Sequence, residues 1–247
     1  MIGAVLIIAA LLGAWELYVD SGGVDDLVLA APSQIAQSLW DDRGLLASNL
    51  GVTAQEVGLG LVAALALGLL LAFAIHFSPT LRRALYPLMV GSQAIPIPIV
   101  APLLVFWLGF GILPKIVIIA LICFFPVVVA TIGGLDRVDP ELRKLMRTLD
   151  ASRWQTFRFT EMPTALPAAL SGTRIAVAVA VIAAVFAEQS GSTSGLGRLI
   201  TQAGYNLDSP RAYAAVVLLA AFAVALFALL GLAERHLLRH RPRDPSR

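Results

Sequence analysis

The sequence predicts an all-α membrane protein with six transmembrane helices. Hydrophobic residues make up 58% of its 247 positions and charged residues only 14%, and the mean hydropathy is +0.83. A soluble domain of ordinary composition carries roughly a quarter charged residues. Six stretches approach the ~20 predominantly apolar residues that a helix needs to cross the hydrocarbon layer, and Lys and Arg are distributed unevenly between the segments that connect them.

The apolar stretches give the expected elements in chain order. The six spans cover about 2–18, 51–77, 88–108, 113–133, 166–187 and 212–233. The first lacks a basic leading segment and a small-residue cleavage site, so we interpret it as a retained span and not as a signal peptide. No internal repeat and no low-complexity linker divides the chain. We therefore expect one transmembrane domain over 1–247.

The distribution of Lys and Arg predicts the orientation. If the charged loop 134–165 is cytoplasmic, six spans place both termini on the same side. Thirteen of the eighteen Lys and Arg residues then lie inside, four lie outside, among them Lys115, and Arg174 lies within a span. Because cytoplasmic loops are enriched in Lys and Arg, this direction is strongly favoured.

The loop 134–165 is expected to hold two short helices. Apolar residues recur at helical spacing over 142–149, and Asp150 interrupts this pattern. Ser152 followed by Gln155 has the form of a capping box, so a second helix should begin there. That helix would place Trp154 and Phe157 on one side and Arg153 outward, and the prolines at 163 and 167 should end it before the next span.

The pattern of this loop leaves two interpretations open. One is an amphipathic helix that lies in the membrane interface, with a tryptophan anchor and basic residues facing lipid headgroups. The other is a docking helix whose aromatic and arginine side chains fill a pocket of a partner protein, since these residue types dominate interface hot spots.

The third predicted span contains candidates for a translocation path. Gln93 is followed by Pro96 and Pro98, and each proline removes a backbone donor, which is tolerated where the freed carbonyls face protein or a water-filled path. Kinks that serve packing alone are the alternative. Three polar residues near the outer ends of spans two and five are further candidates: Gln55, Glu56 and Glu188. For Glu56 and Glu188, interfacial solvation or an interhelical hydrogen bond is the favoured alternative.

The stretch "LMRTLDASRWQTFRFTEMPTALPAALSGTRIA" resembles the cytoplasmic signature loop of ABC importer permeases, with Asp150 at the position of the family's glycine. The namesake Glu-Ala-Ala is replaced by Lys-Leu-Met at 144–146, and Asp tolerates the left-handed conformation that the glycine position requires. "SQAIPIPIVAPLLVFWLGFGILPKI" and "AEQSGSTSGLGRLI" also fit the family that serves nitrate, sulfonate, taurine and thiamine-precursor uptake. "SQAIP" is most similar to permeases for the pyrimidine precursor of thiamine, and riboflavin permeases have a similar sequence there.

The resemblance implies a type I ABC importer permease in a bacterial inner membrane, acting as a homodimer. It implies a coupling helix that docks on a cytoplasmic ATPase through seven residues: Asp150, Ala151, Ser152, Arg153, Trp154, Phe157 and Arg158. Trp154 and Phe157 are the expected anchors. The further partners would be an external substrate-binding protein and membrane lipids, with no nucleic acid. The chain contains no phosphate-binding loop of the form G-x-x-x-x-G-K-[ST], so we expect the partner ATPase to bind ATP and this chain to hold no cofactor or metal and to be no enzyme.

Two other classes of protein fit the sequence less well. A secondary transporter or channel needs coupling ions or a selectivity ring, and the sequence shows neither paired intramembrane acids nor inverted repeats. An intramembrane enzyme needs a catalytic constellation, and neither H-E-x-x-H nor G-x-S-x-G occurs.

Overall fold

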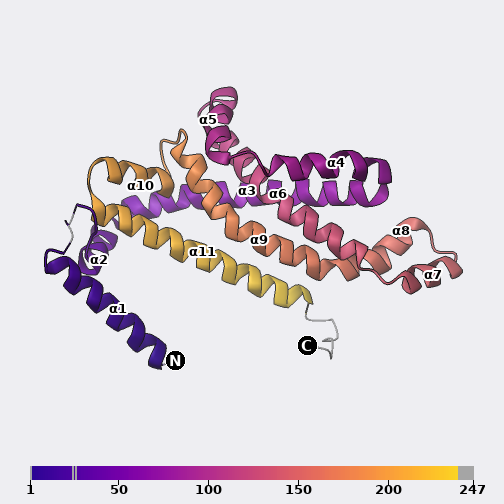
Figure 1. Cartoon of the computed structure of the whole chain (residues 1–247), viewed down its shortest axis with the longest axis horizontal. Coiled ribbons are helices and arrows are strands. Elements are labelled where there is room, and N and C mark those ends of the chain that lie inside the picture. The colour runs from indigo at the N-terminus through magenta and orange to yellow at the C-terminus, as the bar shows by residue number, and fades with distance from the viewer. Residues whose placement is uncertain (1, 24, 26, 239–247) are drawn as a thin grey trace.

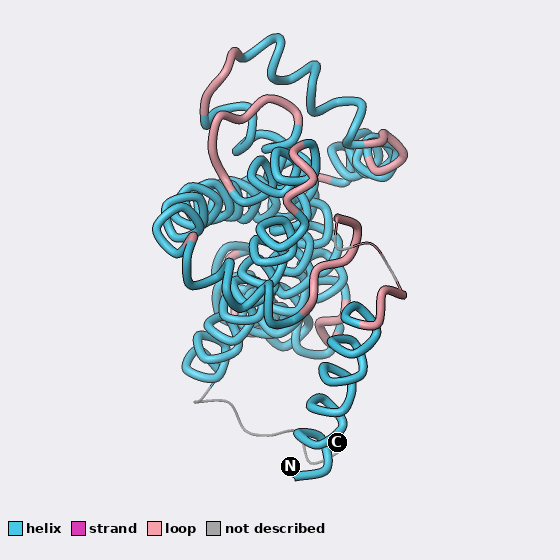
Figure 2. The backbone as a smooth tube through the Cα atoms, turned by 90° about the vertical axis from the view of Figure 1, so that its left-hand side faces the viewer, coloured by secondary structure: helices cyan, strands magenta, loops and turns pink. Residues whose placement is uncertain are grey.

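The computed structural model describes residues 2–23, 25 and 27–238, and within them the chain folds into helices and connecting loops without a strand (Figures 1 and 2). The longer elements are listed here in chain order: α1 Ile2–Asp20, α3 Arg43–Phe77, α4 Pro79–Ser92, α5 Ile97–Leu108, α6 Ile112–Asp136, α9 Met162–Gln189 and α11 Ser209–Leu238. The shorter ones are α2 Pro32–Asp41, α7 Pro140–Thr148, α8 Arg153–Thr156, the π-helical turn η1 Phe157–Glu161 and α10 Leu196–Tyr205.

Helix α6 forms the centre of the bundle and packs along α3 and α9 (Figure 1). Small residues allow this close approach, as they do in many membrane bundles. A Cβ atom on Gly60 would lie 2.6 Å from the Cβ of Ile119, and one on Gly172 would lie 2.6 Å from the carbonyl oxygen of Pro126. The buried core therefore depends on backbone contact between these three helices.

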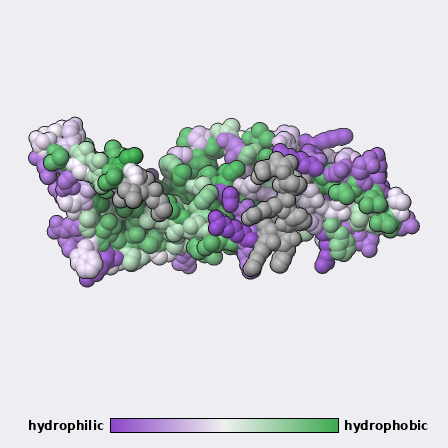
Figure 3. Space-filling view, turned by 90° about the horizontal axis from the view of Figure 1, so that it is seen from below, coloured by the Kyte–Doolittle hydropathy of each residue, from purple (hydrophilic) through white to green (hydrophobic). Residues whose placement is uncertain are grey.

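The number of helices suited to crossing a membrane is compatible with the six that the sequence predicts. Four helical segments of the described chain are long and apolar enough: 43–77, 112–136, 153–189 and 209–236. A fifth would be the pair α4 and α5, and α1 has 19 residues, close to the length of a span. Seen from one side, hydrophobic residues cover much of the middle of the molecule and hydrophilic ones gather toward its two ends, apart from a patch beside the grey C-terminal residues (Figure 3).

The predicted third span at 88–108 is not a straight helix. Helix α4 ends at Ser92 and α5 begins at Ile97, and the two meet at an angle of 102°. Pro96 is the N-cap of α5 and Pro98 occupies its first turn, where a missing backbone donor costs nothing. The prolines thus break the segment at the point where the sequence predicts a bend.

The prediction that prolines 163 and 167 end the second loop helix is wrong. The chain remains helical from Arg153 to Gln189, so α8, η1 and α9 form one continuous element. Its wide π turn is closed by the backbone N–H of Met162, which donates to the carbonyl of Phe157. Pro163 then enters in the first turn of α9, where its missing N–H is tolerated.

Candidate functional site

The turn between α7 and α8 has a fixed geometry. Asp150 has a φ of +51°, in the left-handed region, as its place at the family's glycine position predicts. The N–H of Ala151 donates to Met146 O and that of Asp150 donates to Arg147 O, both at 3.0 Å. This pair of hydrogen bonds is a Schellman motif, which satisfies the last carbonyls of α7.

The start of α8 is the capping box that the sequence predicts. The N–H of Gln155 donates to Ser152 Oγ at 3.2 Å, and the N–H of Ser152 donates to Gln155 Oε1 at 2.7 Å. Two backbone donors at the helix start are satisfied in this way. The order of α7, turn and α8 is therefore specified by local hydrogen bonds.

Because Asp150 has a positive φ, we expect Asp150→Gly to keep or raise the thermal stability of the purified protein, and Asp150→Ala to lower it by about 1 kcal/mol. Thr148→Gly, which places a glycine in the last helical turn of α7, is the matched control and should be destabilising. Thermal unfolding in detergent measures all three. A clear loss of stability in Asp150→Gly would contradict the assigned backbone conformation.

The two predicted anchors occupy different environments. Trp154 is 59% exposed, whereas Phe157 is 3% exposed and packs against Leu135, Ala165 and two rings of α3, those of Phe73 and Phe77. The ring of Trp154 stacks on that of Phe157 with 5.5 Å between centroids. Of the two predicted anchors, Trp154 is therefore accessible in the single chain, whereas the apolar end of α3 covers the ring of Phe157.

A buried carboxylate joins the loop helices to α3. Glu161 is 8% exposed. Its Oε1 accepts from Arg143 Nε and its Oε2 lies against His76 Nε2, both at 2.7 Å. Arg143 also donates to Leu135 O at 2.8 Å, so α7, η1, α6 and α3 meet at this carboxylate. We did not identify this cluster from the sequence, because its members are separated by up to 85 residues.

A second polar cluster lies inside the bundle, toward the end at which α10 begins. Glu188 is fully buried, and its carboxylate accepts from Thr53 Oγ1 at 2.6 Å and from the N–H groups of Gly197 and Arg198 at 2.5 and 3.3 Å. Leu196 N–H donates to Thr53 Oγ1 at 2.9 Å. Side chains of α3 and α9 thus satisfy the first backbone donors of α10.

Glycines make room for this carboxylate. A Cβ on Gly195, whose φ is +111°, would collide with the carboxyl group of Glu188, and one on Gly197 would lie 2.9 Å from Glu188 Oε2. In the sequence, the signal for this cluster is the Gly-x-Gly pattern of Gly195 and Gly197, which follows Glu188 at the end of an apolar span.

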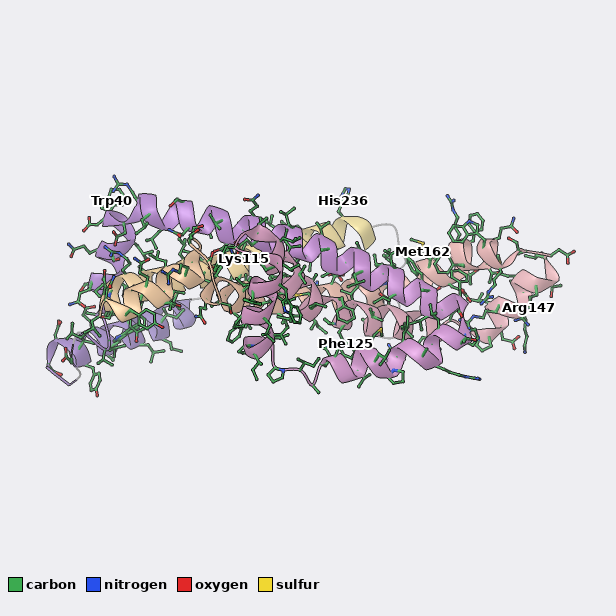
Figure 4. All side chains as sticks on the ribbon, turned by 90° about the horizontal axis from the view of Figure 1, so that it is seen from above. Trp40, Lys115, Phe125, Arg147, Met162 and His236 are labelled. Atoms are coloured by element: carbon green, nitrogen blue, oxygen red, sulfur yellow. The ribbon has the colours of Figure 1, made fainter. Side chains whose placement is uncertain are left out.

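Lys115 belongs to the same region, although the sequence predicts it outside the membrane. It is 6% exposed, and its Nζ lies 3.3 Å from Oε1 of the buried Glu56 (Figure 4). The carboxyl groups of Glu56 and Glu188 are close enough to interact. The sequence interpretation found no paired intramembrane acids, and the structure corrects it. Hydrogen bonds accommodate Glu188 in the bundle, and Lys115 pairs with Oε1 of Glu56, whose Oε2 has no hydrogen-bond partner among the described residues.

The chain matches the family described as "Binding-protein-dependent transport system inner membrane component" over residues 64–243. The chain belongs to this family. It is thus a transmembrane permease of an ABC importer, and ATP hydrolysis in such importers belongs to a separate ATPase subunit.

Two of the relatives described here are named for different transported substrates. It is 35% identical to a probable ABC transporter permease of Haemophilus influenzae over 90% of this chain and 91% of the relative. It is 32% identical to the formylaminopyrimidine transport permease of Halalkalibacterium halodurans, covering 93% and 92% of the two chains. It is 33% identical to the riboflavin transport permease of Chloroflexus aurantiacus, covering 96% and 90%.

The solved structure of an amino acid ABC transporter has the same fold as this permease. The two superpose with a TM-score of 0.65 at 17% identity, over 81% of this chain and 97% of the other. The type I ABC importer permease fold that the sequence predicts is therefore confirmed.

The other predicted path residues of the permease are distributed over two regions. Gln93, Pro96 and Pro98 lie in the bend between α4 and α5, and Gln55 lies on α3; all four are exposed. Glu56 and Glu188 are instead buried between helices, the alternative that the sequence favours for them. The structure therefore separates the six candidates into exposed residues and an internal network.

The end of the permease opposite α7 carries an ion pair between Asp42 and Arg211 (Figure 4 labels Trp40 and Arg147 at these two ends). Arg211 Nε donates to Asp42 Oδ2 at 2.9 Å, and Nη2 donates to Oδ1 at 3.1 Å. The hydrogen bond from Arg211 is the largest cause of the lowered pKa of Asp42. A carboxyl with a lowered pKa contributes stability above the ordinary Asp value of about 3.9, and this contribution is lost as the pH falls through the lowered pKa.

We therefore expect acidification below about pH 4 to release α2 from α11, and Asp42→Asn to reproduce this release at neutral pH. Thiol accessibility of a cysteine at the half-buried residue Gln34 reports the release. Asp41→Asn is the matched control, because no ion pair involving Asp41 is formed within the described residues. Equal accessibility in Asp42→Asn and wild type would contradict the role of the pair.

Proposed function

We propose that α7, α8 and η1 form the element through which a cytoplasmic ATPase drives this permease, and that both chain termini are cytoplasmic. The observation that carries this proposal is the unbroken helix from Arg153 to Gln189. A displacement of α8 is transmitted directly to α9, because no flexible linker separates them. Helix α9 packs against α6 at the centre of the bundle, so the whole bundle can respond.

Several contacts support α8 as a stiff lever. Arg153 Nη2 donates to Phe77 O at 3.0 Å and its guanidinium lies over the Phe77 ring. The buried ring of Phe157 and the carboxylate of Glu161 fix the following turn. Trp154 is then the exposed aromatic anchor that the ATPase cleft receives, while Ala151, Ser152 and Arg158 complete the docking surface and Asp150 sets its turn.

We further propose that two copies of the chain enclose the substrate path, with Gln93, Pro96, Pro98 and Gln55 facing it. Their exposure in the single chain supports this arrangement. Polar and proline-rich segments are tolerated within a membrane where they line a water-filled path. An external binding protein delivers the substrate, and the ATPase binds ATP, so the permease itself needs no cofactor.

The substrate class that we propose is a pyrimidine related to thiamine precursors, or a similar small heterocycle. Relatives named for formylaminopyrimidine and riboflavin transport support a heterocycle, and "SQAIP" at 92–96 resembles the pyrimidine branch. Gln93 is the residue that we assign to selectivity.

Reconstitution tests this function. Proteoliposomes that contain the permease, its genomically adjacent ATPase and its binding protein should accumulate labelled aminopyrimidine only with internal ATP. The permease alone should hydrolyse no ATP. Accumulation without the ATPase, driven by an ion gradient, would establish a secondary transporter instead.

A further inference from the structure

The surface between α7 and α8 is concave and rich in guanidinium groups. A pocket of about 470 Å³ opens there, and its charged or polar lining comes from His76, Arg143, Arg147, Arg153, Thr156 and Glu161. In Figure 4 the side chain of Arg147 lies at the end of the molecule formed by these two helices. Arg153 and Thr156 of the lining belong to α8, the helix that we assign to ATPase docking.

The single carboxylate of the pocket is already occupied. Both oxygens of Glu161 are engaged, one by Arg143 and the other by His76. Glu161 is buried and lines the pocket. Glu161 consequently cannot neutralise the two remaining guanidinium groups without losing these contacts.

Those two groups, the guanidinium groups of Arg147 and Arg153, have no acidic partner among the residues that the structure describes. Arg153 contacts the carbonyl and the ring of Phe77, neither of which carries a charge. The side chain of Arg147 forms no hydrogen bond or ion pair in the part of the chain that the structure describes. Outside the pocket, five basic residues have carboxylate partners: Arg82, Lys115, Lys144, Arg174 and Arg211. Arg147 and Arg153 thus bring two guanidinium groups without a carboxylate partner among the described residues into one cavity.

We propose that this pocket receives the carboxylate of an aspartate or glutamate from the ATPase subunit, bound between Arg147 and Arg153. The inference rests on the proposed docking function and adds the chemistry of the partner residue. A planar guanidinium matches a carboxylate with two parallel hydrogen bonds, and desolvation in a pocket strengthens such a pair. A monoanion fits better than a phosphate dianion, because Glu161 in the lining repels added negative charge.

The position of the pocket favours a protein partner over a lipid headgroup. Helices α7 and α8 lie beyond the turn that joins α3 to α4, at the tip of the molecule (Figure 1). Trp154, which follows the lining residue Arg153 in the chain, is exposed and can supply the apolar contact that typically surrounds an interface charge pair.

Binding of the adjacent ATPase to the permease in nanodiscs, at low and high salt, tests the inference. We expect Arg147→Gln together with Arg153→Gln to weaken binding roughly tenfold at low salt and to remove much of its salt dependence. Arg147→Gln alone should show a smaller loss, and it removes no contact within the permease. Lys144→Gln is the matched control: it lies on the same helix, pairs with Glu141 outside the pocket, and should bind as wild type.

The possible outcomes distinguish the failure of the proposed carboxylate-binding pocket from the failure of the proposed ATPase docking. Loss of binding in Trp154→Ala with wild-type affinity and salt dependence in the double arginine variant would overturn the pocket and leave docking intact. Wild-type affinity in both would refute docking on this surface. If native mass spectrometry finds an anionic lipid that only the arginine variants lose, at unchanged ATPase affinity, the pocket holds a headgroup and the inference is wrong.

Discussion

Replacing Glu188 by alanine should destabilise the end of the bundle at which α10 begins by about 3–5 kcal/mol, the range typical when one member of a buried charged network is removed. The change leaves the hydroxyl of Thr53 and the N–H groups of Gly197 and Arg198 without their acceptor. It also leaves Lys115 and Glu56 beside an empty space of carboxyl size. Helix α10 should consequently detach while the opposite end of the molecule stays folded.

Glu188→Gln is the matched control for this effect. The amide keeps the shape of the side chain and one acceptor oxygen, so we expect a smaller loss of stability than in Glu188→Ala. Thermal unfolding and protease sensitivity of the 190–205 segment measure the difference. If Glu188→Ala unfolds like wild type and α10 stays protected, the carboxylate is not what holds this helix.

Trp154→Ala should abolish co-purification with the ATPase and ATP-driven uptake without lowering the thermal stability of the permease. Trp154 is 59% exposed and its ring stacks on that of Phe157, so we expect the fold not to depend on it. Large exposed aromatics at interfaces commonly contribute 2 kcal/mol or more to binding, which is roughly a thirtyfold change in affinity.

Phe157→Ala provides the contrast. It removes a buried ring from the cluster that joins η1 to α3, so we expect about 3–5 kcal/mol of lost stability in addition to lost ATPase binding. The two variants thus distinguish a residue that contacts the ATPase, Trp154, from a residue that stabilises the fold beneath it, Phe157. Loss of stability in Trp154→Ala, or none in Phe157→Ala, would reverse the roles that the structure assigns to these rings.

Features that depend on neighbouring residues could be predicted from the sequence. The capping box follows from Ser152 and Gln155, three positions apart, and the left-handed turn at Asp150 follows from the resemblance to the family's signature loop; both occur as predicted. The apolar stretches identify the long helices for the same reason, because helical periodicity and length are local properties.

Features that depend on distant residues could not be predicted. Thr53 and Glu188 are separated by 135 positions, and no local pattern shows that α3 and α9 bring them together. Lys115 was predicted among the outside residues from the distribution of Lys and Arg along the chain, and only the structure shows that it is buried and paired with Glu56. Phe157 was predicted as an anchor because the local sequence places it on the same side of the helix as Trp154. The local sequence does not show that the rings of Phe73 and Phe77 on α3 cover it.

The central claim is that a cytoplasmic ATPase acts on the permease through α7 and α8. Selective cysteine labelling tests it most directly, because it shows on which side of the membrane these helices lie and whether the ATPase covers them. Leu149 is 67% exposed at the end of α7, and the sequence's only cysteine, Cys123, is buried, so Leu149→Cys gives a single reactive position. A membrane-impermeant maleimide should label it in inside-out vesicles and not in intact cells, and bound ATPase should protect it. Thr193→Cys, exposed near the other end, should behave in the opposite way. Labelling of Leu149→Cys in intact cells would place the coupling surface outside and contradict the mechanism.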